Sequence, residues 1–108
     1  MIYESRVYTA LPGRLPALLA RFENVTLGFW QKYGIQQVGF FTTAIGPNSQ
    51  DLTYLLAWES LAEREQKWNA FQANPDWIAA RKASEVDGQI VANIASSILT
   101  PTKFSALK

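Results

Sequence analysis

The chain has 108 residues, a length that fits a single domain with a hydrophobic core of its own. Apolar residues make up 48% of it and charged residues 18%, a composition that excludes a disordered chain. Ten basic and nine acidic residues give a formal charge of +1 without a long basic run, which argues against a nucleic-acid partner.

The first third of the chain predicts a strand followed by a long helix. Residues 2–10 alternate and are rich in β-forming types, so they predict a strand that ends before Pro12. From residue 15 to residue 33, apolar side chains recur at steps of three and four, which predicts one helix with a broad apolar face. Pro16 suits the first turn, where its missing N–H would be unpaired, and Gly34 is placed to end the helix with left-handed backbone.

A hairpin is expected next. Residues 36–45, QQVGFFTTAI, and residues 52–58, LTYLLAW, both have the composition of strands. The segment GPNSQD between them is rich in turn-forming residues, so the two strands are expected to pair with each other.

The remaining residues predict a second helical region and a last strand. Ser60, followed three residues later by Glu63, is the capping box that begins a helix. Asn74 and Pro75 predict that a short helix restarts there, with Asn74 as its cap. Residues 89–99 then predict the fourth strand.

The order strand, helix, strand, strand, helix, strand defines the expected fold class. It is the βαββαβ arrangement of the α+β ferredoxin-like folds, in which a four-stranded antiparallel sheet has two helices on one face. No internal repeat, linker or low-complexity segment interrupts the pattern, so residues 1–108 are predicted to form one domain.

The predicted strands are apolar on both faces, although two helices can cover only one face. In the third strand, Tyr54, Leu56 and Trp58 lie opposite Leu55 and Ala57, and in the fourth, Ile90, Ile94 and Ile98 lie opposite Val91, Ala95 and Leu99. Leaving a large apolar side chain in water costs about 1.5–3 kcal/mol. We therefore expect two copies to pack their sheets face to face as a homodimer, a dimeric α+β barrel, with a larger assembly of dimers left open.

Cysteine and histidine are both absent, which limits the chemistry of any site. The chain therefore has no disulfide, no thiolate or imidazole metal ligand, and no cysteine or histidine catalyst, and we expect neither a metal nor a cofactor. The segment MIYESRVYTA lacks the apolar run of a signal peptide, and no stretch approaches the ~20 apolar residues of a spanning helix. A cytoplasmic protein without a membrane span is expected.

Four segments, read in order, resemble the NIPSNAP family: ESRVYTALPGRLPALLARF (4–22), GFFTTAIGPNSQ (39–50), AWESLAERE (57–65) and SSILTPTKFSAL (96–107). The resemblance covers nearly the whole chain and implies a dimeric α+β barrel. It implies no settled catalytic role, although related barrels include antibiotic-biosynthesis-type monooxygenases that need no metal or cofactor, and haem-degrading enzymes. Thr53 and Tyr54 stand where some relatives carry histidine, and Ala106 stands where relatives often carry proline.

The family's first-strand pattern of Glu, Arg and Tyr at alternate positions matches Glu4, Arg6 and Tyr8, which share one face of the strand. Together they suit a carbonyl or carboxylate ligand: Arg6 would bind it, Tyr8 would donate a hydrogen bond, and Glu4 would be the base of an enzyme. The alternative is an ion pair at the dimer interface. Tyr54 and Trp58 are candidates for the wall of an apolar ligand pocket, the alternative being ordinary core packing.

Two further polar groups leave alternatives open. The charged side chains of residues 59–65 favour a capping box and a solvated helix start over a general acid or base near a cleft. Asn93, Ser96 and Ser97 lie on an otherwise apolar strand, where they would hydrogen-bond either a ligand or a partner chain.

Three functions are consistent with these observations. The first is a small-molecule-binding or assembly protein, which acts as a homodimer and takes a small apolar ligand. The second is a cofactor-independent monooxygenase- or isomerase-like enzyme for an aromatic or lipid-like substrate, although no catalytic motif is present. The third is a protein-interaction module that uses the tail or the helix surfaces. A deep, enclosed, mainly apolar cavity with converging polar groups would favour the enzyme.

Overall fold

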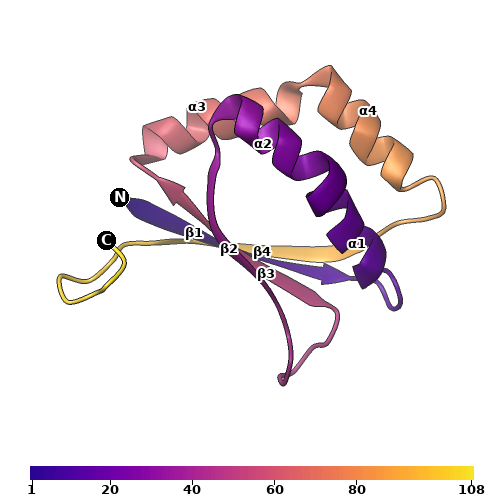
Figure 1. Ribbon diagram of the computed structural model, residues 1–108, viewed down its shortest axis with the longest axis horizontal. Helices are drawn as coiled ribbons and strands as arrows, with labels where there is room; N and C mark the ends of the chain where they lie inside the picture. Colours follow the sequence, from indigo (N-terminus) through magenta and orange to yellow (C-terminus); the bar gives the residue numbers. More distant parts are fainter.

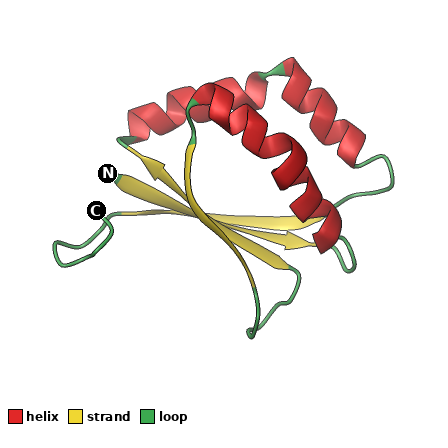
Figure 2. Ribbon diagram, viewed as in Figure 1, coloured by secondary structure: helices red, strands yellow, loops and turns green.

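A twisted four-stranded sheet carries all the helices on one face in the computed structural model, which describes residues 1–108 (Figures 1 and 2). The elements in chain order are β1 Ile2–Ala10, α1 Leu15–Arg21, η1 Phe22–Thr26, α2 Leu27–Tyr33, β2 Gln36–Thr42, β3 Asp51–Trp58, α3 Leu61–Ala73, α4 Pro75–Ser84 and β4 Val91–Leu99. The strand order is β2-β3-β1-β4, and every neighbouring pair is antiparallel. The predicted α+β ferredoxin-like fold is confirmed. None of the helices combines the length and the apolar character that a membrane crossing requires.

Two side-chain caps and one glycine set the predicted helix boundaries. The Ser60 hydroxyl accepts a hydrogen bond from the Glu63 N–H at 3.1 Å, and the Asn74 side chain accepts from the N–H groups of Asp76 and Trp77. Gly34 has φ 70°, so it ends α2 in the left-handed conformation that glycine tolerates best. The capping box differs in one detail from its usual form, because the Glu63 carboxylate accepts from the N–H of residue 59 rather than from that of Ser60.

The prediction of one continuous α-helix over residues 15–33 was wrong for the middle of that segment. Residues 22–26 form the π-helix η1, in which the N–H of Leu27 bonds the carbonyl of Phe22, five residues earlier. The Thr26 hydroxyl donates to the Arg21 carbonyl at 3.3 Å, so the side chain satisfies an acceptor beside the wider turn. Apolar spacing still fits one continuous helix, which is why the sequence pattern did not reveal η1.

The core lies between the sheet and the helices and is strongly aromatic. Phe22 on η1 has its ring centroid 5.4 Å from that of Tyr8, 5.7 Å from that of Trp30 and 5.3 Å from that of Tyr54. The side chains that are less than 2% exposed are those of Trp30, Trp58, Tyr54, Phe71, Leu18, Leu52, Leu56, Ile90 and Glu4. A carboxylate therefore lies among the most deeply buried groups of the protein.

The opposite face of the sheet has no helix over it (Figure 2). Register places Val7 beside Thr53 and Ala95, and Tyr3 beside Ala57 and Leu99, on this side. This arrangement confirms the predicted division of β3, in which Leu55 and Ala57 lie opposite Tyr54, Leu56 and Trp58.

The predicted faces of β4 were partly wrong. The pairing between β1 and β4 shifts register between Thr9 and Ala10, and Val91 pairs with Ala10, whose side chain faces the helices. Val91 therefore lies on the same side as Ile94 rather than opposite it. The strand also begins at Val91 instead of residue 89, β2 ends at Thr42 instead of residue 45, and β3 begins at Asp51 instead of residue 52.

Candidate functional site

The carboxylate of Glu4 is the centre of a buried polar cluster on β1. Its side chain is 0% exposed and accepts five hydrogen bonds from other side chains. Arg64 donates two of them, from Nε to Oε1 at 2.8 Å and from Nη2 to Oε2 at 3.0 Å. Arg6 Nη1 donates at 3.1 Å, Trp58 Nε1 at 3.1 Å and Ser96 Oγ at 2.8 Å. We call Glu4, Arg6, Trp58, Arg64 and Ser96 the Glu4 cluster.

These contacts decide the charge of Glu4. Burial alone would raise its pKa, but the hydrogen bonds from Arg64, Ser96 and Trp58 and the charge of Arg6 outweigh burial and lower the pKa to about 2. The carboxylate is therefore ionised at neutral pH, and both of its oxygens are occupied by donors. A general base needs a pKa near the working pH and a free lone pair, so Glu4 is unsuited to that role.

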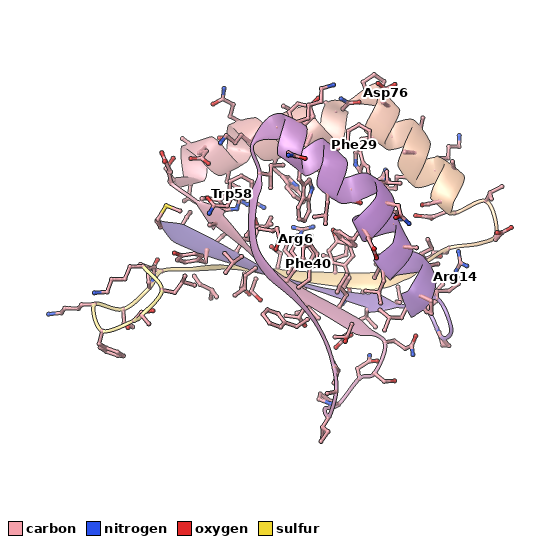
Figure 3. The ribbon with its side chains drawn as sticks, viewed as in Figure 1. Arg6, Arg14, Phe29, Phe40, Trp58 and Asp76 are labelled. Atoms are coloured by element: carbon pink, nitrogen blue, oxygen red, sulfur yellow. The ribbon has the colours of Figure 1, made fainter.

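Arg6 connects the Glu4 cluster to two phenols. Its Nε donates to the Tyr54 hydroxyl at 2.8 Å, its Nη2 donates to the Tyr8 hydroxyl at 3.2 Å, and its guanidinium carbon lies 4.6 Å from the ring centroid of Trp68. Figure 3 shows Arg6 in the layer between the sheet and the helices. Burial raises the pKa of Tyr54 well above its usual value of 10, so this phenol keeps its proton.

Tyr8 completes this polar chain. Its hydroxyl accepts from Arg6 and from the Tyr54 hydroxyl, which donates at 3.2 Å. A hydroxyl that accepts twice still has its own hydrogen to donate. Tyr8 can therefore offer a hydrogen bond to an acceptor outside the cluster.

A cavity of about 630 Å³ lies against Arg6 and Tyr8, between the sheet and the helices. Its 16 lining residues are Arg6, Tyr8, Arg21, Phe22, Thr26, Trp30, Trp68, Phe71, Gln72, Trp77, Ile78, Arg81, Lys82, Glu85, Val91 and Ile94. Ile78 on α4 and Ile94 on β4 are each 44% exposed, so the cavity opens to solvent between these two elements. Nine of the 16 lining residues are hydrophobic, which makes the wall mixed rather than mainly apolar.

The cavity separates the residues that the sequence grouped together. Arg6 and Tyr8 line it, whereas Glu4, Tyr54 and Trp58 do not. Glu4 and Tyr54 accept hydrogen bonds from Arg6, Tyr54 donates to Tyr8, and Trp58 donates to Glu4. The Glu4–Arg6 ion pair expected as an alternative does exist, but it lies beneath the helices, not on the open face of the sheet.

Sequence reasoning missed Arg64 as a partner of Glu4. The stretch 59–65 forms the predicted cap, yet Arg64 turns inward from the first turn of α3 to a carboxylate 60 residues earlier. Arg64 follows shortly after Trp58, the last residue of β3, which also bonds Glu4. That Arg64 lies near Glu4 can be recognised only when the pairing of β1 with β3 is known. Among the last-strand polar residues, Ser96 faces the helices and bonds Glu4, while Asn93 and Ser97 pair with Thr9 and Ser5 on the open face. No group of three or more Asp, Glu, His or Cys side chains is placed to hold a metal ion.

Comparison with known proteins gives a consistent result. The NIPSNAP family model matches residues 3–106. A NIPSNAP family protein from Agrobacterium tumefaciens superposes with a TM-score of 0.87 at 27% identity, over 100% of this chain and 94% of that chain. A second one from the same organism has a TM-score of 0.87 at 24% identity, over 99% and 98% of the two chains. A protein from Nitrosomonas europaea, described as a candidate antibiotic biosynthesis monooxygenase, has a TM-score of 0.64 at 9% identity, over 94% and 98%, and shares the fold alone. No curated protein matches the sequence at a significant level.

Proposed function

The chain belongs to the NIPSNAP family, and from this premise we propose that it is a homodimeric protein that binds a small molecule between its sheet and its helices. The observation that carries the proposal is a fixed guanidinium and a free phenol hydrogen at the wall of an open cavity. Both groups are held by the protein itself, so a ligand would meet donors that need no rearrangement.

Arg6 is held in place on every side. Glu4, Tyr8 and Tyr54 each accept one of its hydrogen bonds, and Trp68 lies against the guanidinium plane. The Glu4 cluster contains one carboxylate and two guanidinium groups, so it keeps one positive charge. A buried net positive charge next to a cavity favours a ligand that brings a hydrogen-bond acceptor to Arg6 and Tyr8.

Binding is preferred to cofactor-independent catalysis because of Glu4. An enzyme of that kind would need a base at the cavity wall, and the carboxylate on β1 has a pKa of about 2 and five donors on its oxygens. The cavity also opens to solvent at Ile78 and Ile94, whereas a reaction site that excludes water is usually enclosed.

Dimer formation is supported by the uncovered face of the sheet. Phe41 is 56% exposed and Leu99 46% exposed there, and the half-buried Val7 and Leu55 lie on the same face. Large apolar side chains exposed together on one uncovered face favour an interaction surface. Two identical faces related by a two-fold axis would cover each other and complete a barrel.

The cavity is tested by titration with N-phenyl-1-naphthylamine, a neutral aromatic dye whose fluorescence rises in apolar sites. We expect saturable binding to the wild type at one dye per chain. Ile94→Trp places an indole at the cavity mouth and should weaken dye binding at least about tenfold. Ile45→Trp is the matched control, because Ile45 is 100% exposed in the β2–β3 loop and should not affect binding. Equal dye binding by the two variants would reject the cavity as the site.

A further inference from the structure

The layer between the sheet and the helices holds a second, smaller cavity of about 270 Å³. Its wall is apolar apart from one carboxylate, and it consists of Leu19, Phe22, Glu23, Leu27, Phe40 and Leu52. Its strand residues come from β2 and β3, whereas those of the larger cavity, here called the first cavity, come from β1 and β4. Because the strand order is β2-β3-β1-β4, the two cavities lie over opposite halves of the sheet.

Phe22 is the one residue that lines both cavities. Its ring centroid lies 5.4 Å from that of Tyr8 and 5.7 Å from that of Trp30, which belong to the wall of the first cavity. It also lies 5.3 Å from the ring centroid of Phe40, which belongs to the second. The buried ring of Phe22 therefore separates the two cavities.

The backbone around Phe22 is the π-helix η1, which contributes to both walls. Thr26 lines the first cavity and Glu23 lines the second. Single π-helical turns inside α-helices are frequent at functional sites. The irregular turn thus lies at the division between the two cavities.

The polar and apolar groups of the two cavities are unevenly distributed. Arg81 and Lys82 line the first cavity, are exposed to solvent and take part in no ion pair. Together with the exposed Ile78 and Ile94, they form its mouth. Accessible positive charge at the mouth attracts an anion, and the apolar second cavity beyond Phe22 suits a hydrocarbon chain.

From these observations we infer that the ligand is a fatty-acid-like anion, and that Phe22 limits the length of its chain by closing the passage between the two cavities. The carboxylate lies in the first cavity on the side of Arg81 and Lys82, and the chain extends toward Phe22. The inference rests on the proposed binding function and adds the ligand class and a residue that determines specificity.

The test measures how binding depends on chain length. Octanoate, decanoate, dodecanoate and tetradecanoate, each below its micelle-forming concentration, are added to displace bound N-phenyl-1-naphthylamine. Each further methylene that is buried should strengthen binding about threefold to fourfold, and in the wild type this gain should stop where the chain meets Phe22. Phe22→Ala should extend the gain to longer chains and bind tetradecanoate at least about tenfold more tightly than the wild type.

Further variants separate the passage from general loosening of the core. Phe22→Leu keeps more of the packing and should shift the length limit in the same direction, and adding Leu27→Trp, which fills the second cavity, should restore the wild-type limit. Phe29→Leu is the matched control, because Phe29 is half-buried against Trp77 and lines neither cavity, and it should keep the wild-type limit.

The charged group is tested with decanoate. Arg81→Gln with Lys82→Gln should weaken decanoate several-fold and leave the neutral dye unaffected. Lys32→Gln with Lys103→Gln makes the same change in net charge at two exposed lysines outside both cavity walls, and it should have no effect. Equal decanoate affinity in the two double variants would overturn the anionic head.

The outcomes distinguish this inference from the binding function on which it rests. One length limit shared by the wild type and both Phe22 variants would overturn the role of Phe22. Failure of all four acids to displace a bound dye would overturn the ligand class and leave the binding function intact. If the dye itself does not bind, calorimetric titration with dodecanoate decides, and the absence of heat would reject both proposals.

Discussion

Arg64 binds Glu4 through two hydrogen bonds, from Nε at 2.8 Å and from Nη2 at 3.0 Å, across 60 residues of sequence. This bidentate contact joins the first turn of α3 to the middle of the sheet, because Glu4 lies on β1, between β3 and β4. It also fixes the carboxylate that orients Arg6 at the cavity wall. The Glu4 cluster therefore holds α3 against the sheet and also fixes the position of Arg6 at the cavity wall.

Glu4→Gln is expected to destabilise the protein strongly. The substitution leaves Arg6 and Arg64 without a negative partner and turns an amide N–H₂ toward their donors. Breaking a buried ion pair from one side costs about 3–5 kcal/mol, and we expect a loss of that size in the free energy of unfolding measured with urea. Glu23→Gln changes an exposed carboxylate and should stay within about 0.5 kcal/mol of the wild type. Similar stability of the two variants would show that the Glu4 cluster contributes little.

Acid should destabilise the protein through the same carboxylate. Because the folded pKa of Glu4 is lowered from 4.5 to about 2, the unfolded chain binds the proton more tightly than the folded chain. The stabilisation is thus fully present above about pH 4.5 and is lost as the pH falls toward 2, by about 3 kcal/mol in total. Urea unfolding at a series of pH values should show this loss in the wild type and a shallower slope in Glu4→Gln. Parallel slopes in the two proteins would assign acid sensitivity to other groups.

The order of elements could be predicted because it depends on local patterns. Period-two and period-3.6 spacings, the Ser60 and Asn74 caps and the left-handed Gly34 all act within a few residues. The shared face of Glu4, Arg6 and Tyr8 followed from the strand period alone.

Features that depend on register or on distant contacts could not be predicted. The shift between Thr9 and Ala10 moved Val91 to the helix side, and nothing in the spacing of apolar residues marks that shift. The contact between Arg64 and Glu4 needs α3 to lie over β1. The indole N–H groups of Trp30 and Trp77, which are buried without a partner, are identified only when burial is known, because a tryptophan at helical spacing looks the same whether or not its N–H is paired.

Tyr8→Phe should weaken the binding of ligands that carry an acceptor. The change removes the Tyr8 hydroxyl, which accepts from Arg6 and Tyr54 at the cavity wall, and keeps the ring that packs against Phe22. We expect 1-naphthoate affinity to fall by about threefold to tenfold, measured by dye displacement. Tyr33→Phe removes a phenol that accepts from Asn74 outside the cavity lining, and it should leave binding unchanged. Unaltered affinity in Tyr8→Phe would place the acceptor elsewhere in the cavity.

Leu55→Glu should separate the two chains of the proposed dimer. Leu55 lies on β3, on the uncovered side of the sheet, and a carboxylate there would be buried against its counterpart in a two-fold interface. Sedimentation should show a shift from dimer toward monomer. Leu61→Glu makes the same chemical change on the exposed start of α3, where the leucine is 61% exposed, and the dimer should persist. A dimer that survives Leu55→Glu would require a different interface.

Native mass spectrometry of freshly purified protein tests the homodimeric binding function most directly, because it reports the number of chains and any retained small molecule together. The account predicts two 12.1 kDa chains that carry a small organic molecule, and the same dimer without it in Ile94→Trp. A single chain at every protein concentration, or a retained molecule whose occupancy is unchanged in Ile94→Trp, would contradict the account.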